Sequence, residues 1–174
     1  MGRRSIKENK NIYQESREEA GMTRAAASDA TQFLSESRIE KIESEKSLPH
    51  PEEVLAMASA YKKPGLCNWY CSHECPIGQE YVPEVKVSEL SQIVLEMLAS
   101  LNALNNQKER LVEITVDGAI TSDELRDFAE IRRVLGQITM AVDSLQLWCD
   151  SQVMSGKLDR KELERVENLL KQKK

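Results

Sequence analysis

Hydrophobic residues in the second half of the chain recur at alternating intervals of three and four, with polar residues between them. This spacing places side chains on one face of an α-helix and is typical of long helices that pack side by side at shallow angles. We therefore expect residues 87–174 to form a helical bundle or coiled coil. The first series is Val87, Leu90, Val94, Met97, Leu101, Leu104 and Leu111, broken at Lys108; the second is Phe128, Ile131, Leu135, Ile138, Val142, Leu145 and Cys149; the third is Leu163, Val166 and Leu170.

Residues 1–64 carry shorter helical patterns separated by turn signals. Thr23 and Ser35 are suited to cap the starts of two helices, and Gly21 is suited to end the helix before them. Ile39 and Ile42 share one face of the third helix, so we expect both to point inward. The pattern predicts helices at 12–20, 24–33 and 36–44 and a fourth that starts at Pro51. The chain as a whole is predicted to be all-α.

A connector at residues 65–86 is rich in Cys, Pro and Gly. Cys67, Cys71 and Cys75 are spaced by four, which places them on one side of a helix. With His73 they are ligand types for zinc, or for an iron–sulfur cluster that has a further ligand. Sulfurs on consecutive turns of one helix do not easily surround an ion, so the favoured interpretation is packing as small buried hydrophobes. Metal binding and redox sensing stay open as alternatives.

Composition and charge narrow the class of protein. Seven Gly and five Pro among 174 residues favour helices over sheets, which need many turns. An apolar run of about 18 residues and a signal peptide are both lacking, so we expect no membrane partner and a cytoplasmic location. Residues 1–64 hold 11 basic and 11 acidic residues, and residues 65–174 hold 13 and 18. Any contact with DNA must therefore come from a few well-placed cations.

Two stretches in the first domain, "SREEAGMTRAAAS" and "LSESRIEKIESEKSLPHPEEVLAMASAY", resemble lambda-repressor-like (Cro-type, Xre) helix-turn-helix transcriptional regulators in order and spacing. The resemblance covers about residues 10–63. It implies that the third helix, residues 36–44, lies in the major groove of DNA and that the start of the second helix contacts phosphate. Glu45 stands where this family commonly has a glycine that ends the third helix.

The resemblance also assigns roles to individual side chains. Arg24 is expected to contact phosphate at the start of the second helix, where the helix terminus already favours an anion. The expected readers of base edges are Glu36, Ser37 and Lys41, and the expected contacts to the DNA backbone are Arg38 and Lys46.

The function predicted from these observations is sequence-specific DNA binding by a transcriptional regulator. The chain lacks a phosphate-cradling Gly-rich loop, a Ser/His/Asp set and paired carboxylates that stand above chance, so we expect no enzyme. Its partners should be double-stranded DNA and a second copy of the chain, joined through residues 87–174. The alternatives are a helix-turn-helix adaptor that contacts proteins, and a metal- or redox-responsive regulator that uses Cys67, Cys71 and Cys75, which we call the Cys row. No cofactor is expected except under the zinc or iron–sulfur alternative.

Overall fold

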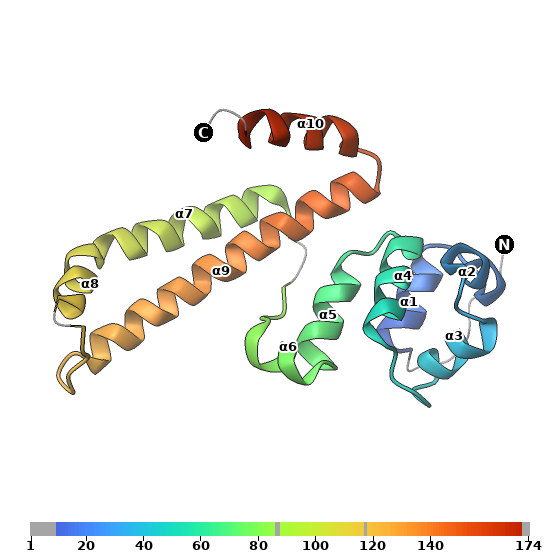
Figure 1. Ribbon diagram of the computed structural model, residues 1–174, viewed down its shortest axis with the longest axis horizontal. Coiled ribbons are helices and arrows are strands. Elements are labelled where there is room, and N and C mark those ends of the chain that lie inside the picture. The colour runs from blue at the N-terminus through green and yellow to red at the C-terminus, as the bar shows by residue number, and fades with distance from the viewer. Residues whose placement is uncertain (1–9, 86–87, 117, 172–174) are drawn as a thin grey trace. The chain divides into compact units, whose positions relative to one another are not determined.

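The computed structural model describes residues 10–85, 88–116 and 118–171, and the regular structure in this part of the chain is entirely α-helical (Figure 1). The predicted all-α fold is thereby confirmed for the described residues. The bounds are α1 Ile12–Glu19, α2 Arg24–Thr31, α3 Glu36–Glu43, α4 Pro51–Tyr61, α5 Gly65–His73, α6 Pro76–Tyr81, α7 Leu90–Asn106, α8 Lys108–Thr115, α9 Leu125–Met154 and α10 Arg160–Lys171.

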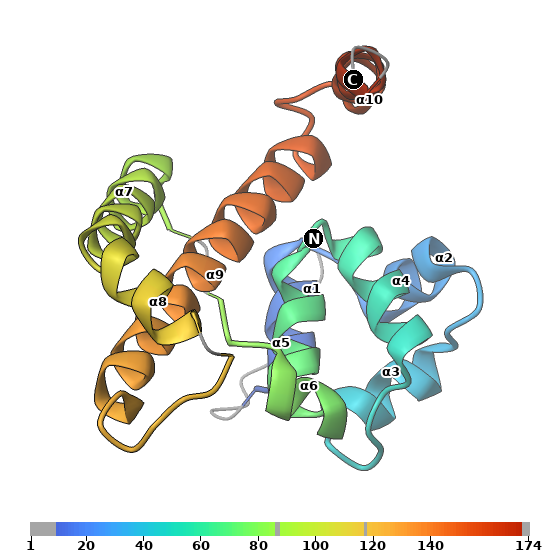
Figure 2. The same ribbon diagram turned by 60° about the vertical axis from the view of Figure 1, so that its left-hand side comes forward.

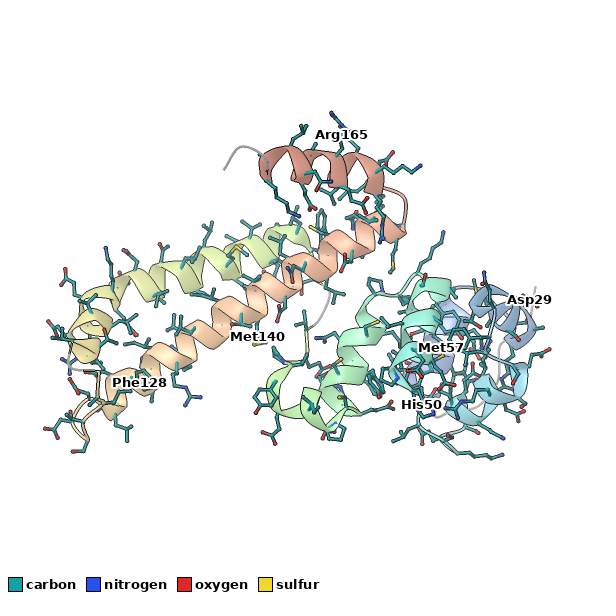
Figure 3. All side chains as sticks on the ribbon, viewed as in Figure 1. Asp29, His50, Met57, Phe128, Met140 and Arg165 are labelled. Atoms are coloured by element: carbon teal, nitrogen blue, oxygen red, sulfur yellow. The ribbon has the colours of Figure 1, made fainter. Side chains whose placement is uncertain are left out.

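The described residues form two compact units. The first contains those before Val85 and those from Cys149 onward, and the second is Val85–Trp148. The core of the first unit lies among α1 to α5. Met57 of α4 is fully buried there, and Figure 3 draws it among the side chains of the neighbouring helices. Ile39 and Ile42 are buried as predicted. The other members are Tyr13, Ala27, Leu34, Val54, Ala58, Tyr61 and Leu66.

The predicted caps of α2 and α3 are confirmed. The Thr23 hydroxyl oxygen accepts a hydrogen bond from the Ala26 backbone N–H at 3.1 Å. The Ser35 hydroxyl oxygen accepts one from the Arg38 backbone N–H at 3.2 Å. These bonds satisfy backbone donors that the first turn of a helix leaves without a partner. Gly21 follows α1 with a φ of +71°, a conformation that glycine adopts without steric cost.

The end of α3 needs the same left-handed conformation but has no glycine. Glu45 adopts a φ of +58°. Its N–H donates to the Ile42 carbonyl at 3.0 Å, and the Lys46 N–H donates to the Lys41 carbonyl at 2.9 Å. This pair of bonds is the Schellman arrangement that closes many helices. A side chain at the left-handed position raises its energy, so Glu45 holds the turn at a cost in stability.

Helices α5 and α6 extend the first unit through a tight contact between their backbones. Leu66 of α5 is buried in the core of the domain. Pro76 begins α6, where its missing N–H costs no hydrogen bond. Gly78 approaches α5 so closely that an added Cβ would lie 2.0 Å from the carbonyl oxygen of Cys71. Only glycine fits this contact without a movement of the helices.

The second unit is a hairpin in which α7 and α9 lie side by side and run in opposite directions, joined through α8 (Figures 1 and 2). Ile93 and Ser100 of α7 are buried. So are Val134, Ala141 and Leu147 of α9. Ser100 and Ala141, which are both small, line the same cleft between the two helices.

The buried edge of the hairpin is displaced from the centre of the predicted series. Three members of the first series and two of the second keep between 37% and 45% of their surface exposed; these are Leu90, Val94, Leu101, Leu135 and Val142. Val87, with which the first series begins, lies outside the described residues. The interruption foreseen at Lys108 coincides with the junction of α7 and α8. The two helices therefore contact each other along one margin of their apolar stripes.

Helix α10 has an apolar side but contains no buried residue. None of the helices in the described part of the chain is both long and apolar enough to cross a membrane.

Candidate nucleic-acid interface

The solvent-facing side of α3 is the centre of the candidate interface. Burial of Ile39 and Ile42 sets the rotation of the helix, because each is at most 1% exposed. Ser37 and Lys41 are one turn apart and both are exposed. Glu36 is also exposed, in the first turn of the helix. The structure thus brings the three expected readers of base edges together on one surface.

Arg24 lies beside this surface but is already engaged. Its Nε donates to Oε2 of Glu43 at 2.8 Å. The Arg24 side chain nevertheless keeps 38% of its surface exposed, so its terminal nitrogens can reach a phosphate. The ion pair fixes the direction of Arg24 relative to α3, because Glu43 belongs to α3 and its side chain is 1% exposed.

A second arginine shares the Glu43 carboxylate. Arg17 of α1 donates from Nε to Oε1 at 2.5 Å and from Nη2 to Oε2 at 3.0 Å. Two cations from α1 and α2 therefore converge on one buried anion of α3. Neither Glu43 nor Arg17 is among the residues that the sequence pattern singled out. The available signal was the position of Glu43 four residues after Ile39, which puts it on the inward side of α3.

Arg38 makes its hydrogen bonds to other residues of the same domain. Its Nε and Nη2 donate to the two carboxylate oxygens of Glu53 at 2.7 and 2.6 Å. Nη1 donates to the Ser47 hydroxyl at 2.7 Å, and Nη2 also reaches the Leu48 carbonyl at 2.9 Å. Arg38 thereby ties α3 to the loop and to the start of α4. Its expected contact with the DNA backbone stays a prediction, and that contact would have to share or break these bonds.

Glu53 completes this tie at the start of α4. Its carboxylate accepts from the His50 backbone N–H at 2.7 Å and so caps the helix. Figure 3 labels His50 at this corner. The hydrogen bonds from Arg38 are the main reason that the pKa of Glu53 lies below its ordinary value. The Glu53 carboxylate therefore stays charged to lower pH than a free glutamate.

The exposed side chains of α3 and of the turn after it form the candidate recognition surface, and they carry charges of both signs. Lys41 and Lys46 are cations that extend into solvent, and the exposed carboxylates are Glu36, Glu40 and Glu45. Two positive charges thus stand against three negative ones. Phosphate contacts contribute most of the non-specific affinity of DNA-binding proteins, so this surface by itself is a weak attractor of DNA.

The Cys row occupies α5 and the start of α6. Cys67, Cys71 and Cys75 are each partly buried, and Cys75 directly precedes α6. Burial raises the pKa of the Cys67 and Cys71 thiols, which disfavours the thiolate that binds metal or reacts. Among the described residues no three His, Cys, Asp or Glu side chains converge on a point where they could hold a metal ion.

His73 is held by neighbours on its own helix. Its ring stacks on Trp69 with centroids 4.8 Å apart, and Nδ1 lies 3.0 Å from the Trp69 carbonyl oxygen. Trp69 also meets the ring of Tyr13 edge-on at 5.7 Å. The Tyr13 hydroxyl donates to Glu74 at 2.6 Å, which links α1 to the end of α5. The zinc or iron–sulfur alternative for the Cys row and His73 stays a prediction.

Comparison with known proteins gives one match. Residues 14–65 match the model of a family described as a helix-turn-helix domain. The match runs from α1 through α4 and ends at the first residue of α5. Searches against curated proteins and against solved structures gave no match. The N-terminal domain is therefore of the helix-turn-helix class, and its assignment to the lambda-repressor-like subgroup stays a prediction.

Proposed function

We propose that this chain is a sequence-specific, DNA-binding transcriptional regulator whose helix α3 enters the major groove. The observation that carries the proposal is the exposed pair of Ser37 and Lys41 on a capped helix, locked in rotation by Ile39 and Ile42. In helix-turn-helix domains the second helix of the motif presents its first turns to base edges. We further propose that the protein binds double-stranded DNA in the cytoplasm and that it is not an enzyme.

The side chains on this surface have suitable chemistry for the readout of bases. Lys41 can donate to the O6 and N7 acceptors of guanine, and Ser37 can donate or accept. Glu36 can accept from the amino group of cytosine. Arg24, at the first residue of α2, supports a phosphate contact beside the helix terminus. Lys46 would reach the backbone from the turn after α3.

The proposal also includes a homodimer, because regulators of this class commonly read two half-sites related by a two-fold axis. The exposed apolar residues of the second unit support an assembly through that part of the chain.

A binding selection on the full-length protein tests the proposal. Random duplex DNA is bound, recovered and sequenced over several rounds, and the Kd of the enriched sequence is compared with that of a scrambled one. We expect the enriched site to bind at least about 10³-fold more tightly at physiological salt. A scrambled duplex that binds equally well, or no enrichment at all, would overturn sequence-specific recognition.

A second candidate function is that of a protein-contacting adaptor, and the three exposed carboxylates on and after α3 favour it. Such a surface suits a basic protein partner better than a polyanion. The same selection separates the two functions, since an adaptor enriches no sequence. A metal- or redox-responsive regulator is not supported by the geometry of the Cys row. Metal analysis of protein purified without oxygen tests that alternative directly.

A further inference from the structure

An aromatic side chain is exposed in the turn that joins α2 to α3 (Figure 1). Phe33 keeps 61% of its surface in contact with solvent. Across residues 24–46, all of which the structure describes, Phe33 is the one large hydrophobic residue that is exposed. One exposed apolar residue is common on a protein surface, so the position of Phe33 decides what it can contact.

The backbone of this turn is held by local hydrogen bonds. Gln32 ends α2 in a left-handed conformation with a φ of +67°, and its N–H donates to the Ser28 carbonyl at 3.1 Å. The Phe33 N–H donates to the Thr31 carbonyl at 2.9 Å. Thr31 itself is buried, so the turn is anchored in the domain at this point. Two backbone hydrogen bonds therefore fix the direction in which the chain leaves α2 and presents Phe33.

The residue after Phe33 directs its ring outward. Leu34 is buried in the same core as Ile39, and the two flank the start of α3 at the positions of a hydrophobic staple. The chain enters the helix in an extended conformation, since Ser35 has a φ of −71° and a ψ of 155°. Neighbouring side chains of an extended chain point to opposite sides. Because Leu34 points into the core, Phe33 and Ser35 point away from it, to the side on which α3 is exposed.

We propose that Phe33 contacts the methyl group of a thymine in the bound DNA and that this contact makes Phe33 a specificity-determining residue. The inference rests on the proposed function, in which the first turns of α3 meet the edges of bases in the major groove. Phe33 precedes Glu36, the first residue of α3, by three positions, a span of about 10 Å at most. In that complex its ring would therefore lie beside the base edges that the start of α3 approaches.

The chemistry of the major groove selects the partner of the ring. Within a duplex the faces of the bases are covered by stacking, so an aromatic side chain can meet only their edges. The C5-methyl group of thymine is the apolar group on these edges, and phenylalanine is among the side chains that contact it. Such a contact removes apolar surface from water and needs no release of counterions. It therefore suits a candidate recognition surface on which three carboxylates stand beside two lysines.

Replacement of thymine by deoxyuridine tests the contact, because the two bases differ only by this methyl group. The duplex recovered from the binding selection is remade with a single deoxyuridine at each thymine in turn, and fluorescence anisotropy gives the Kd of the full-length protein. We expect one position at which loss of the methyl group weakens binding by the wild type about fourfold. In Phe33→Ala the same replacement should leave the Kd unchanged.

A matched control removes an equally exposed apolar side chain elsewhere in the domain. Leu55 of α4 is 62% exposed, and Leu55→Ala should keep the full effect of deoxyuridine. On the unmodified selected duplex, Phe33→Ala should bind at least about fivefold more weakly than the wild type. Its salt slope should stay that of the wild type, because no phosphate contact is lost. Should Phe33→Ala lose helicity by circular dichroism, Phe33→Gln replaces it, and the effect of deoxyuridine should again disappear.

The outcomes separate this inference from the proposed function. An effect of deoxyuridine that is equal in the wild type and in Phe33→Ala would overturn the thymine contact and leave sequence-specific binding standing. A selected site without thymine, or a wild type that no deoxyuridine affects, would do the same. Loss of the effect in Leu55→Ala as well would show that it does not depend on Phe33 and would also overturn the contact. Selection of no sequence at all would overturn the proposed function, and this inference with it.

Discussion

The Arg17 guanidinium of α1 and the Glu43 carboxylate of α3 form a buried ion pair with two hydrogen bonds, and Arg24 of α2 binds the same carboxylate. Helices α1, α2 and α3 are thus joined at one anion. The rotation of α3 is therefore set by an ionic contact as well as by its two isoleucines.

Removal of the anion should be costly. Glu43→Gln removes the buried counter-charge of Arg17 and leaves it only the Glu18 carboxylate at 3.9 Å, so we expect the free energy of unfolding to fall by about 3–5 kcal/mol. Urea denaturation followed by circular dichroism measures the change. Arg24→Ala is the control, since Arg24 is partly exposed and should contribute about 0–1 kcal/mol. An equal fall in the free energy of unfolding for both variants would show that the burial of Arg17 does not determine the size of the loss.

Glycine should be a better residue than glutamate at position 45. Glu45→Gly relieves a left-handed backbone conformation, and we expect a gain of about 1 kcal/mol in the free energy of unfolding. The thermal midpoint measures this gain. Glu40→Gly is a fitting control, because it removes the same charge from a helical position and should destabilise the domain by about 1 kcal/mol. A loss of stability in Glu45→Gly would contradict the assigned strain.

DNA contacts should divide into specific and non-specific ones. Lys41→Ala should cost about 1–3 kcal/mol on the preferred site and relax the base preference, because Lys41 is proposed to contact base edges. Arg24→Ala should weaken binding to all sequences alike and flatten the salt slope by about one unit. Fluorescence anisotropy on specific and scrambled duplexes at several salt concentrations separates the two effects. Identical behaviour of the two variants would count against the placement of α3 in the groove.

The contact between α5 and α6 should depend on glycine. Gly78→Ala places a methyl group against the Cys71 carbonyl, and we expect either separation of α6 or a loss of about 1–3 kcal/mol. Hydrogen exchange of the α6 amides reports on the separation. Gly136→Ala in α9 is the matched control, because its Cβ meets nothing within 4 Å and should stabilise its helix by about 1 kcal/mol.

Acid should weaken the tie between α3 and α4. The folded-state pKa of Glu53 lies below the ordinary value of 4.5, so its contribution to stability is fully present above that value. The contribution is lost as the pH falls through the folded pKa, when Glu53 takes up a proton. Glu53→Gln should therefore reduce the slope of stability against pH below about 4.5. The measurement is the denaturation midpoint of both proteins from pH 3 to pH 7. An unchanged slope in Glu53→Gln would refute this role of Glu53.

Local features of the first domain were predictable because their causes lie within a few residues. The caps at Thr23 and Ser35, the turn at Gly21 and the inward isoleucines follow from side-chain chemistry and helical spacing. The capture of Arg38 by Glu53 was not predictable in the same way. Those two residues are 15 positions apart, and only the packing of α3 on α4 brings them together.

The hairpin shows the same limit in another form. An alternation of three and four identifies an apolar stripe, but it does not say which margin of the stripe meets the neighbouring helix. Ser100, a polar residue, is buried at that margin, where its hydroxyl donates to the Glu96 carbonyl oxygen at 2.8 Å. Its hydrogen bond is satisfied within its own helix, and the hydrophobic pattern contains no record of its burial.

If α3 reads DNA as proposed, the scarcity of free cations on α3 and the turn after it has a consequence for how the protein searches a genome. Bulk DNA offers millions of competing sites, and each captures a regulator in proportion to the counterions that it releases. A protein whose surface has three carboxylates beside two lysines would bind little of this non-specific DNA. A small cellular pool could then occupy its operator, because little of it would be sequestered elsewhere.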